Sequence, residues 1–224
     1  MRVAHWKSLP VTLVLGLLAG SAPALTWAQV AESPTDATSD QAGVTPPTEP
    51  RIDEPFGHAW LGAADADVTV VVFADYACPA CRDAQPVIDQ LLARDSKLKV
   101  VYRFLVNDED GRTAALTSLA VAQLNADWGR FHRALDAAGA PSSKTIAEAL
   151  AASGVEQAKL PDLKDEDSGT LPLAEELSRN DSLIVQRKGT AIPAWLIGDG
   201  PAQKGFDLPR LQTAIAEARA AKTH

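Results

Sequence analysis

The only two cysteines of the chain, Cys78 and Cys81, stand between a strand-like run and a helix-like run. Residues 68–73 form an unbroken β-branched and aromatic run, which predicts a strand buried on both faces. Residues 79–93 predict a helix that begins at Pro79, because proline is favoured at the first helical position. Two thiols at a strand-to-helix junction are typical of a redox site. The junction therefore favours an α/β fold built on strand, helix and strand.

The rest of the chain extends this plan. Residues 100–104 predict the strand that completes a βαβ unit with a right-handed crossover, and residues 58–60 an edge strand. Helical patterns then follow up to about residue 187, a hairpin is expected between 194 and 205, and the last helix begins after Asp207. The patterns predict helices at 116–124, 127–139, 146–153 and about 169–187. The α/β fold is thus βαβ, then inserted helices at about 107–187, then ββα.

Residues 1–28 have the pattern of a secretory signal peptide. Arg2 and Lys7 are basic, residues 11–19 are apolar, and small residues precede a cleavage position after Ala28. Cleavage after Ala24 is the alternative. The other interpretation is a membrane anchor, but the apolar run is shorter than the ~20 residues that a spanning helix needs. The segment predicts export to the periplasm.

Residues 29–50 are rich in Pro, Thr, Ser and acidic residues, which predicts a disordered linker. The remaining segment, 51–224, is long enough for one domain with a substantial core. The whole chain has 29 acidic against 21 basic side chains, a formal charge of −8. This acidity argues against nucleic acid or an anionic membrane surface as partner.

The positions of the two thiols predict different roles. A free thiol has a pKa of about 8.5, and a helix N-terminus lowers it through the dipole and free backbone N–H groups. Cys78 should be the exposed nucleophile, with N–H donors from Ala80 and Cys81. Cys81, one turn further on, should be the shielded resolving thiol. A structural disulfide or a metal pair is the alternative, and two thiolates could also hold copper.

Two segments carry a resemblance to a known family. Residues 70–81 (VVVFADYACPAC) and 189–194 (GTAIPA) are similar to the active-site motifs of the DsbA-like thiol:disulfide oxidoreductases of the bacterial periplasm. Pro86 and residues 131–135 also match, and the resemblance covers about residues 56–221. It implies a thioredoxin-like fold with a helical insertion. It also implies a cis Ile192–Pro193 bond beside the cysteines, where a substrate strand binds by β-augmentation.

The resemblance implies an enzyme that exchanges disulfides with exported cysteine-containing proteins. Its cofactor is the Cys78–Cys81 disulfide itself, with no metal, and a membrane redox partner recycles it. A disulfide reductase or isomerase is the alternative, although the polar linker favours a monomer. A periplasmic copper-handling protein is the alternative from another class. The expected site comprises the catalytic Cys78 and Cys81, with Pro79, Ala80, Ile192, Pro193 and Tyr76 around the substrate.

Several other positions are weaker candidates. Val72 stands where many family members have a buried acid that relays the proton of the resolving thiol, and Ala191 replaces a frequent glycine. Asp75 could accept a proton but is more simply an exposed turn residue. Tyr76 lines the substrate groove or packs under the helix. Arg82 is most simply a solvated residue of the helix, and His58 and His132 are surface or core residues. Pro86 should kink the helix. The tryptophans expected in the core are Trp60, Trp128 and Trp195.

Overall fold

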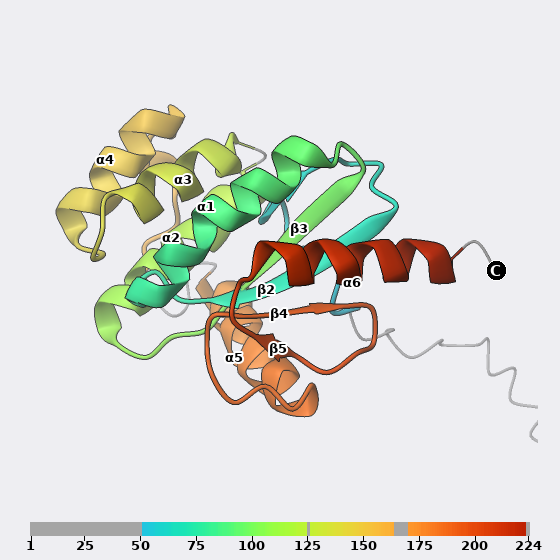
Figure 1. Cartoon of the computed structure of the whole chain (residues 1–224). Coiled ribbons are helices and arrows are strands. Elements are labelled where there is room, and N and C mark those ends of the chain that lie inside the picture. The colour runs from blue at the N-terminus through green and yellow to red at the C-terminus, as the bar shows by residue number, and fades with distance from the viewer. Residues whose placement is uncertain (1–50, 125, 164–169, 223–224) are drawn as a thin grey trace, which may run out of the picture. The chain divides into compact units, whose positions relative to one another are not determined.

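The computed structural model describes residues 51–124, 126–163 and 170–222, and the expected signal peptide and linker lie outside them. A five-stranded mixed sheet carries helices on both faces (Figure 1). The strands, in their order across the sheet, are β1 (Trp60–Gly62), β3 (Leu98–Phe104), β2 (Val68–Ala74), β4 (Ala194–Ile197) and β5 (Gln203–Lys204).

The centre of the sheet is the predicted βαβ unit. Strand β2 pairs in parallel with β3, with Val70 opposite Val100 and Val72 opposite Tyr102. Helix α1 (Pro79–Arg94) connects the two strands, as expected, and continues through Pro86. On its other side β2 pairs antiparallel with β4, which in turn pairs with β5. The fold is therefore α/β and thioredoxin-like in its strand arrangement.

Among the described residues between β3 and β4, the structure has four α-helices and a short 3-10 turn. They are α2 (Glu109–Gln123), α3 (Trp128–Ala137), α4 (Ser143–Ser153), η1 (Gln157–Lys159) and α5 (Leu171–Gln186). Helix α6 (Leu208–Ala221) follows β5. Side chains at the N-terminal ends explain several boundaries: Asp108, Asp127, Ser142 and Asp207 each accept a backbone N–H from the first turn of the following helix.

Alternation along β2 divides the core between the two faces of the sheet. Val70 and Val72 belong to the larger cluster, which includes residues of all six α-helices, with Leu173 and Leu177 from the first half of α5. Val71 and Phe73 belong to a smaller cluster with Ile184 of α5. Helices α1 and α6 accordingly lie over one face and α5 over the other (Figure 1). Burial on both faces explains the continuous apolar run of β2.

The edge strand was predicted two residues too early. It spans Trp60–Gly62 rather than 58–60, because the N–H of His58 donates to the carbonyl of Ala122 instead of to β3. Trp60, expected in the core, is only half-buried, and the Nζ of Lys99 lies 4.9 Å from its ring centroid. A cation over an aromatic face explains how this ring is accommodated at the sheet edge.

A buried arginine fixes the start of the described chain to the α5 face of the sheet. Arg103 of β3 is almost fully buried and forms an ion pair with Glu176 of α5, whose side chain is 1% exposed. Its guanidinium also donates to the carbonyls of Arg51, Ile52 and Glu54. The charge is therefore compensated inside the core, as a buried arginine requires.

Candidate active site

Cys78 is the N-cap residue of α1. Its backbone is extended, and its Sγ accepts the N–H of Cys81 at 3.3 Å. Pro79 is the first helical residue, as predicted, while Pro79 and Ala80 are exposed and Cys78 is half-buried. Donors were expected from both Ala80 and Cys81, but the hydrogen bond to Cys78 comes from Cys81, since an N-cap side chain reaches the N–H three residues on.

Cys81 lies one turn further into α1 and is only 7% exposed. Both cysteines are free thiols. Burial and the neighbouring Cys78 raise the pKa of the Cys81 thiol well above its usual range, and a backbone hydrogen bond from Asp75 opposes that shift. The two sulfurs therefore occupy unequal environments: Cys78 is accessible at the helix end and Cys81 is protonated and shielded.

The segment containing Ile192 and Pro193 directly precedes β4, next to β2 in the sheet. The Ile192–Pro193 peptide bond is cis, and both side chains are half-buried. Pro193 and Cys81 line the same small cavity. The fold thus brings two segments more than one hundred residues apart in the sequence to the same place.

Tyr76 does not face a substrate groove. Its side chain is 3% exposed and stacks on Phe104, with ring centroids 4.8 Å apart. Its hydroxyl lies 2.9 Å from Ser118 Oγ and 2.9 Å from His132 Nδ1. Of the two interpretations left open by the sequence, packing beneath α1 is the one observed. The side chain of Tyr76 is buried because its hydroxyl has hydrogen-bonding partners on two helices of the insertion.

These bonds form a chain with a defined direction. Trp128 Nε1 can only donate, and it donates to Ser118 Oγ at 3.0 Å. At the other end of the chain Gln85 Oε1 can only accept, so a neutral His132 donates its Nε2–H to this oxygen at 3.2 Å. Nδ1 of His132 then accepts from the Tyr76 hydroxyl, and Ser118 donates to Tyr76. His132 is accordingly a core residue in neutral form, and burial lowers its pKa to about 3.

Asp75 is buried rather than an exposed turn residue. Its carboxylate accepts the N–H of Ala77 at 2.9 Å, and the backbone N–H and side-chain amide of Asn107 at 3.2 and 2.9 Å. Gly111 comes so close that a Cβ there would lie 2.6 Å from Asp75 Oδ1. Asp75 therefore joins the loop before Cys78 to the connection between β3 and α2. The sequence around Asp75 does not show this role, because its hydrogen-bonding partner Asn107 is 32 residues away.

Arg82 also stabilises the loop. Its Nη1 donates to the carbonyl of Tyr76 at 2.8 Å, and the side chain is half-buried, not fully solvated. His58, in contrast, is exposed. Asp136 of α3, which the sequence did not single out, lies beside the cysteine helix: it lines the small cavity with Cys81 and Val72. Burial raises the pKa of Asp136 to about 6.

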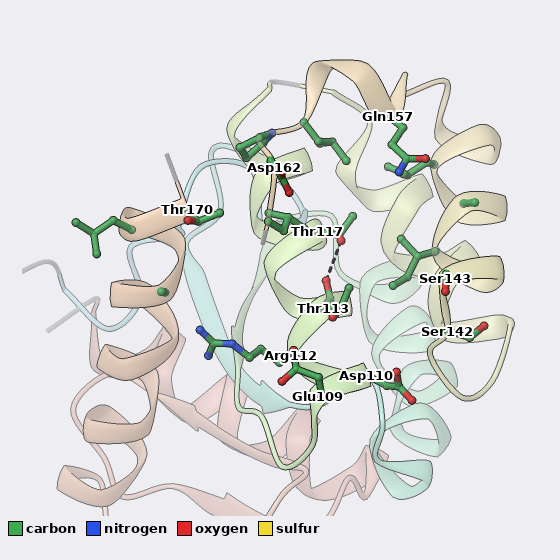
Figure 2. A pocket seen from close by; sticks show the side chains of 18 residues that line it. Glu109, Asp110, Arg112, Thr113, Thr117, Ser142, Ser143, Gln157, Asp162 and Thr170 are labelled. Carbon is green, nitrogen blue, oxygen red and sulfur yellow. Dashed lines mark hydrogen bonds between the residues drawn. The ribbon is translucent and has the colours of Figure 1, made fainter. Parts of the chain in front are cut away.

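A larger cavity, of about 980 Å³, lies within the helical insertion (Figure 2). Thr113 and Thr117 of α2 stand along it, with Ser142 and Ser143 at the start of α4 on one side and Thr170 at the start of α5 on the other. Neither cysteine belongs to its lining. The chemistry of the two thiols is therefore separate from this cavity.

Within the described ranges, no group of three or more His, Cys, Asp or Glu side chains is arranged to hold a metal ion. In the same part of the chain, no helix combines the length and apolar character needed to cross a membrane.

A βαβ unit joined to an antiparallel ββα half, with two cysteines at the start of α1, defines a thioredoxin-like fold. The chain belongs to the thioredoxin family: the family described as Thioredoxin matches residues 56–187, more than half of the chain. The family-level resemblance drawn from the sequence is confirmed. A search of curated proteins gives no match.

Solved structures agree with this assignment. A thioredoxin-like oxidoreductase from Silicibacter pomeroyi DSS-3 has a TM-score of 0.63 and 27% identity, over 72% of this chain and 91% of that one. A periplasmic thioredoxin-like protein from Salmonella enterica serovar Typhimurium has a TM-score of 0.64 and 21% identity, over 75% and 94%. The thiol-disulfide exchange protein alpha-DsbA2 from Wolbachia pipientis has a TM-score of 0.63 and 24% identity, over 71% of this chain and 86% of that one.

Proposed function

We propose that this protein is a periplasmic thiol:disulfide oxidoreductase that acts on exported cysteine-containing proteins. The observation that carries the proposal is the unequal pair at the start of α1. Cys78 is accessible and accepts a backbone N–H, whereas Cys81 is 7% exposed and one turn further in. Thiol–disulfide exchange requires one thiolate that meets the substrate and a second thiol that is protected until it resolves the mixed disulfide.

In the oxidising direction, a substrate thiolate attacks Cys78 Sγ of the Cys78–Cys81 disulfide. The bond between the two cysteines breaks, and its electron pair leaves on Cys81, which takes up a proton. A second substrate thiolate then attacks the substrate sulfur of the mixed disulfide, and Cys78 leaves as the thiolate. The substrate gains a disulfide and the enzyme is left as a dithiol, which a membrane redox partner reoxidises.

The position of Pro193 supports the location of the substrate. It lies at the cavity beside Cys81, immediately before β4, and Ile192 precedes it. In the proposed complex a substrate strand pairs with the backbone next to Ile192, while Pro79 and Ala80 form the exposed border of the site. Tyr76 is buried in the core, where it supports the site by packing, and makes no contact with the substrate.

The trapping experiment uses single-cysteine variants. Cys81→Ser should accumulate mixed disulfides with exported proteins through Cys78, because the resolving thiol is absent. Cys78→Ser should accumulate none, since Cys81 is buried. Equal trapping by both variants, or trapping through Cys81 alone, would contradict the assignment of roles. Light scattering should give the mass of a monomer, whereas a stable dimer would favour the isomerase alternative.

A further inference from the structure

A cavity the size of a water molecule lies beside the resolving thiol. Its volume is about 10 Å³, close to the minimum that one water needs. Side chains of the ends of β2 and β3, of α1 and of α3 enclose it. Its polar lining consists of Cys81, Asp75, Tyr76, Gln85, Tyr102, His132 and Asp136. Such a site can bind a water through several hydrogen bonds.

The proposed exchange requires a proton acceptor near Cys81. In the reducing direction, Cys81 must lose its proton before it can attack the mixed disulfide at Cys78. Burial raises the pKa of Cys81, so the proton does not leave readily by itself. Val72, which lines the same cavity, has no titratable group. The titratable side chains on the cavity wall are therefore the candidates to take the proton.

Two of the candidates already have their acceptor atoms engaged. His132 accepts from Tyr76 at Nδ1, and its other nitrogen carries the proton donated to Gln85. Asp75 accepts three hydrogen bonds, from Ala77 and from the backbone and side chain of Asn107. Asp75 is also 2% exposed, which isolates its carboxylate from bulk water. Both side chains are therefore buried and already hydrogen-bonded to other groups.

Asp136 differs in both respects. No hydrogen bond or ion pair joins its carboxylate to another described residue, whereas nearby Asp89 is engaged by Gln85 and Arg133. Asp136 lines the cavity and is only half-buried, so its side chain is not isolated from solvent. With a pKa raised to about 6, it can both bind and release a proton near neutral pH.

We propose that Asp136 is the proton acceptor of Cys81, through one water in the cavity that the two side chains share. The Cys81 thiol gives its proton to the water, and the water gives a proton to the Asp136 carboxylate. The Cys81 thiolate then attacks Cys78 Sγ. The Cys78–Cys81 bond forms, the bond from Cys78 to the substrate sulfur breaks, and its electron pair leaves on the substrate. In the oxidising direction, Asp136 returns the proton to Cys81.

Charged and titratable groups on each neighbouring element act on Asp136. Positive Arg82 lowers its pKa, whereas burial and the negative Asp89 and Asp83 raise it. Burial raises the pKa of the Tyr76 and Tyr102 hydroxyls, and the negative charge of Asp136 acts in the same direction. The charged and titratable residues that line the cavity or act on Asp136 are Cys81, Arg82, Asp83 and Asp89 on α1, Asp75 and Tyr76 after β2, Tyr102 on β3, and His132 on α3. Arg133 of α3 donates a hydrogen bond to Asp89.

The test separates the two chemical steps by stopped flow. The reduced protein is mixed with 5,5′-dithiobis(2-nitrobenzoate), from about pH 4 to about pH 8. Attack by Cys78 releases one coloured thiolate, and attack by Cys81 on the resulting mixed disulfide releases the second. Asp136→Asn should leave the first phase within about twofold of wild type. It should slow the second phase by roughly tenfold or more and remove its pH dependence near pH 6.

A purely electrostatic role makes the opposite prediction. Removing a negative charge beside Cys81 favours its thiolate, so the second phase would become faster. A second phase that is unchanged or faster in Asp136→Asn therefore overturns the assignment. Asp83→Asn is the matched control, because it removes an exposed charge near Asp136 without altering the cavity lining. It should retain the wild-type second phase, and a slowing as large as that of Asp136→Asn would overturn the assignment as well.

This inference rests on the proposed exchange activity, and the same experiment distinguishes the two. Absence of a second phase in the wild-type protein would overturn the exchange between the cysteines, and the role of Asp136 with it. A normal second phase in the wild type together with an unaffected Asp136→Asn variant would leave the exchange intact and reject Asp136 alone. Thermal unfolding of the variant shows that it remains folded under the conditions of the assay.

Discussion

Glu176→Gln should destabilise the protein strongly although it changes a single atom. Glu176 is the buried counter-charge of Arg103, whose side chain is 2% exposed. The glutamine keeps the shape of the side chain and an oxygen that can accept a hydrogen bond. What it removes is the negative charge, so the positive guanidinium stays in the core without its compensating partner.

The neighbouring contacts set the expected magnitude. Removing one partner of a buried ion pair costs about 3–5 kcal/mol in general. Here Arg103 keeps the carbonyls of Arg51, Ile52 and Glu54 as acceptors, which favours the lower end of that range. The second partner of Glu176, Arg179, is partly exposed at 35% and contributes about 1 kcal/mol or less. We therefore expect a loss of about 3 kcal/mol in the free energy of unfolding.

Urea unfolding of the fully reduced protein measures this loss. The midpoint should fall while the slope with urea stays constant, which is the sign of a change in stability alone. Glu175→Gln, at the preceding exposed position of α5, is the matched control and should change stability by less than about 0.5 kcal/mol. A loss below about 1 kcal/mol for Glu176→Gln would refute the reasoning, because the carbonyls alone would then suffice to compensate Arg103.

Three further outcomes are expected. Tyr76→Phe should cost about 1–3 kcal/mol in urea unfolding, because it leaves the buried Nδ1 of His132 without its donor; a neutral effect would contradict the contribution of these buried hydrogen bonds to stability. Ala80→His should raise the reduction potential, measured by equilibration with glutathione, by placing a donor or positive charge near the Cys78 thiolate; the wild-type value should lie between about −270 and about −120 mV. Burial raises the pKa of Asp136 from 3.8 to about 6, so its native state binds the proton more tightly than the unfolded chain does. The resulting stability is complete below about pH 4 and is lost as the pH rises through about 6, a loss that Asp136→Asn should not show when unfolding is followed across this range.

Local signals in the sequence were sufficient to predict the framework and the positions of the two cysteines on it. The apolar run of β2, proline at the start of α1 and the capping side chains Asp127 and Asp207 each act within a few residues. Their positions along the chain therefore predict the corresponding elements. The cysteine spacing likewise predicts one accessible and one shielded thiol, because both positions belong to a single helical turn.

The surroundings of the thiols could not be predicted in the same way. Asp75 is buried because Asn107 supplies two of its donors, and Tyr76 is buried because His132 and Ser118 bind its hydroxyl. Asp136 reaches the cavity beside Cys81 only through the packing of α3 near α1. Each of these contacts joins residues about 30 to 60 positions apart, so neither periodicity nor a local motif contains it.

Arg103 also determines where a mechanical load would enter the domain. Its guanidinium holds three carbonyls at the first described residues, on the face of the sheet that α5 covers, whereas α1 lies over the opposite face (Figure 1). A pull on the chain ahead of Arg51 is therefore transmitted to β3 and α5. Tension at this end of the domain therefore acts on an ion pair in the core, and it reaches the strand that leads to Cys78 only through the pairing of β3 with β2.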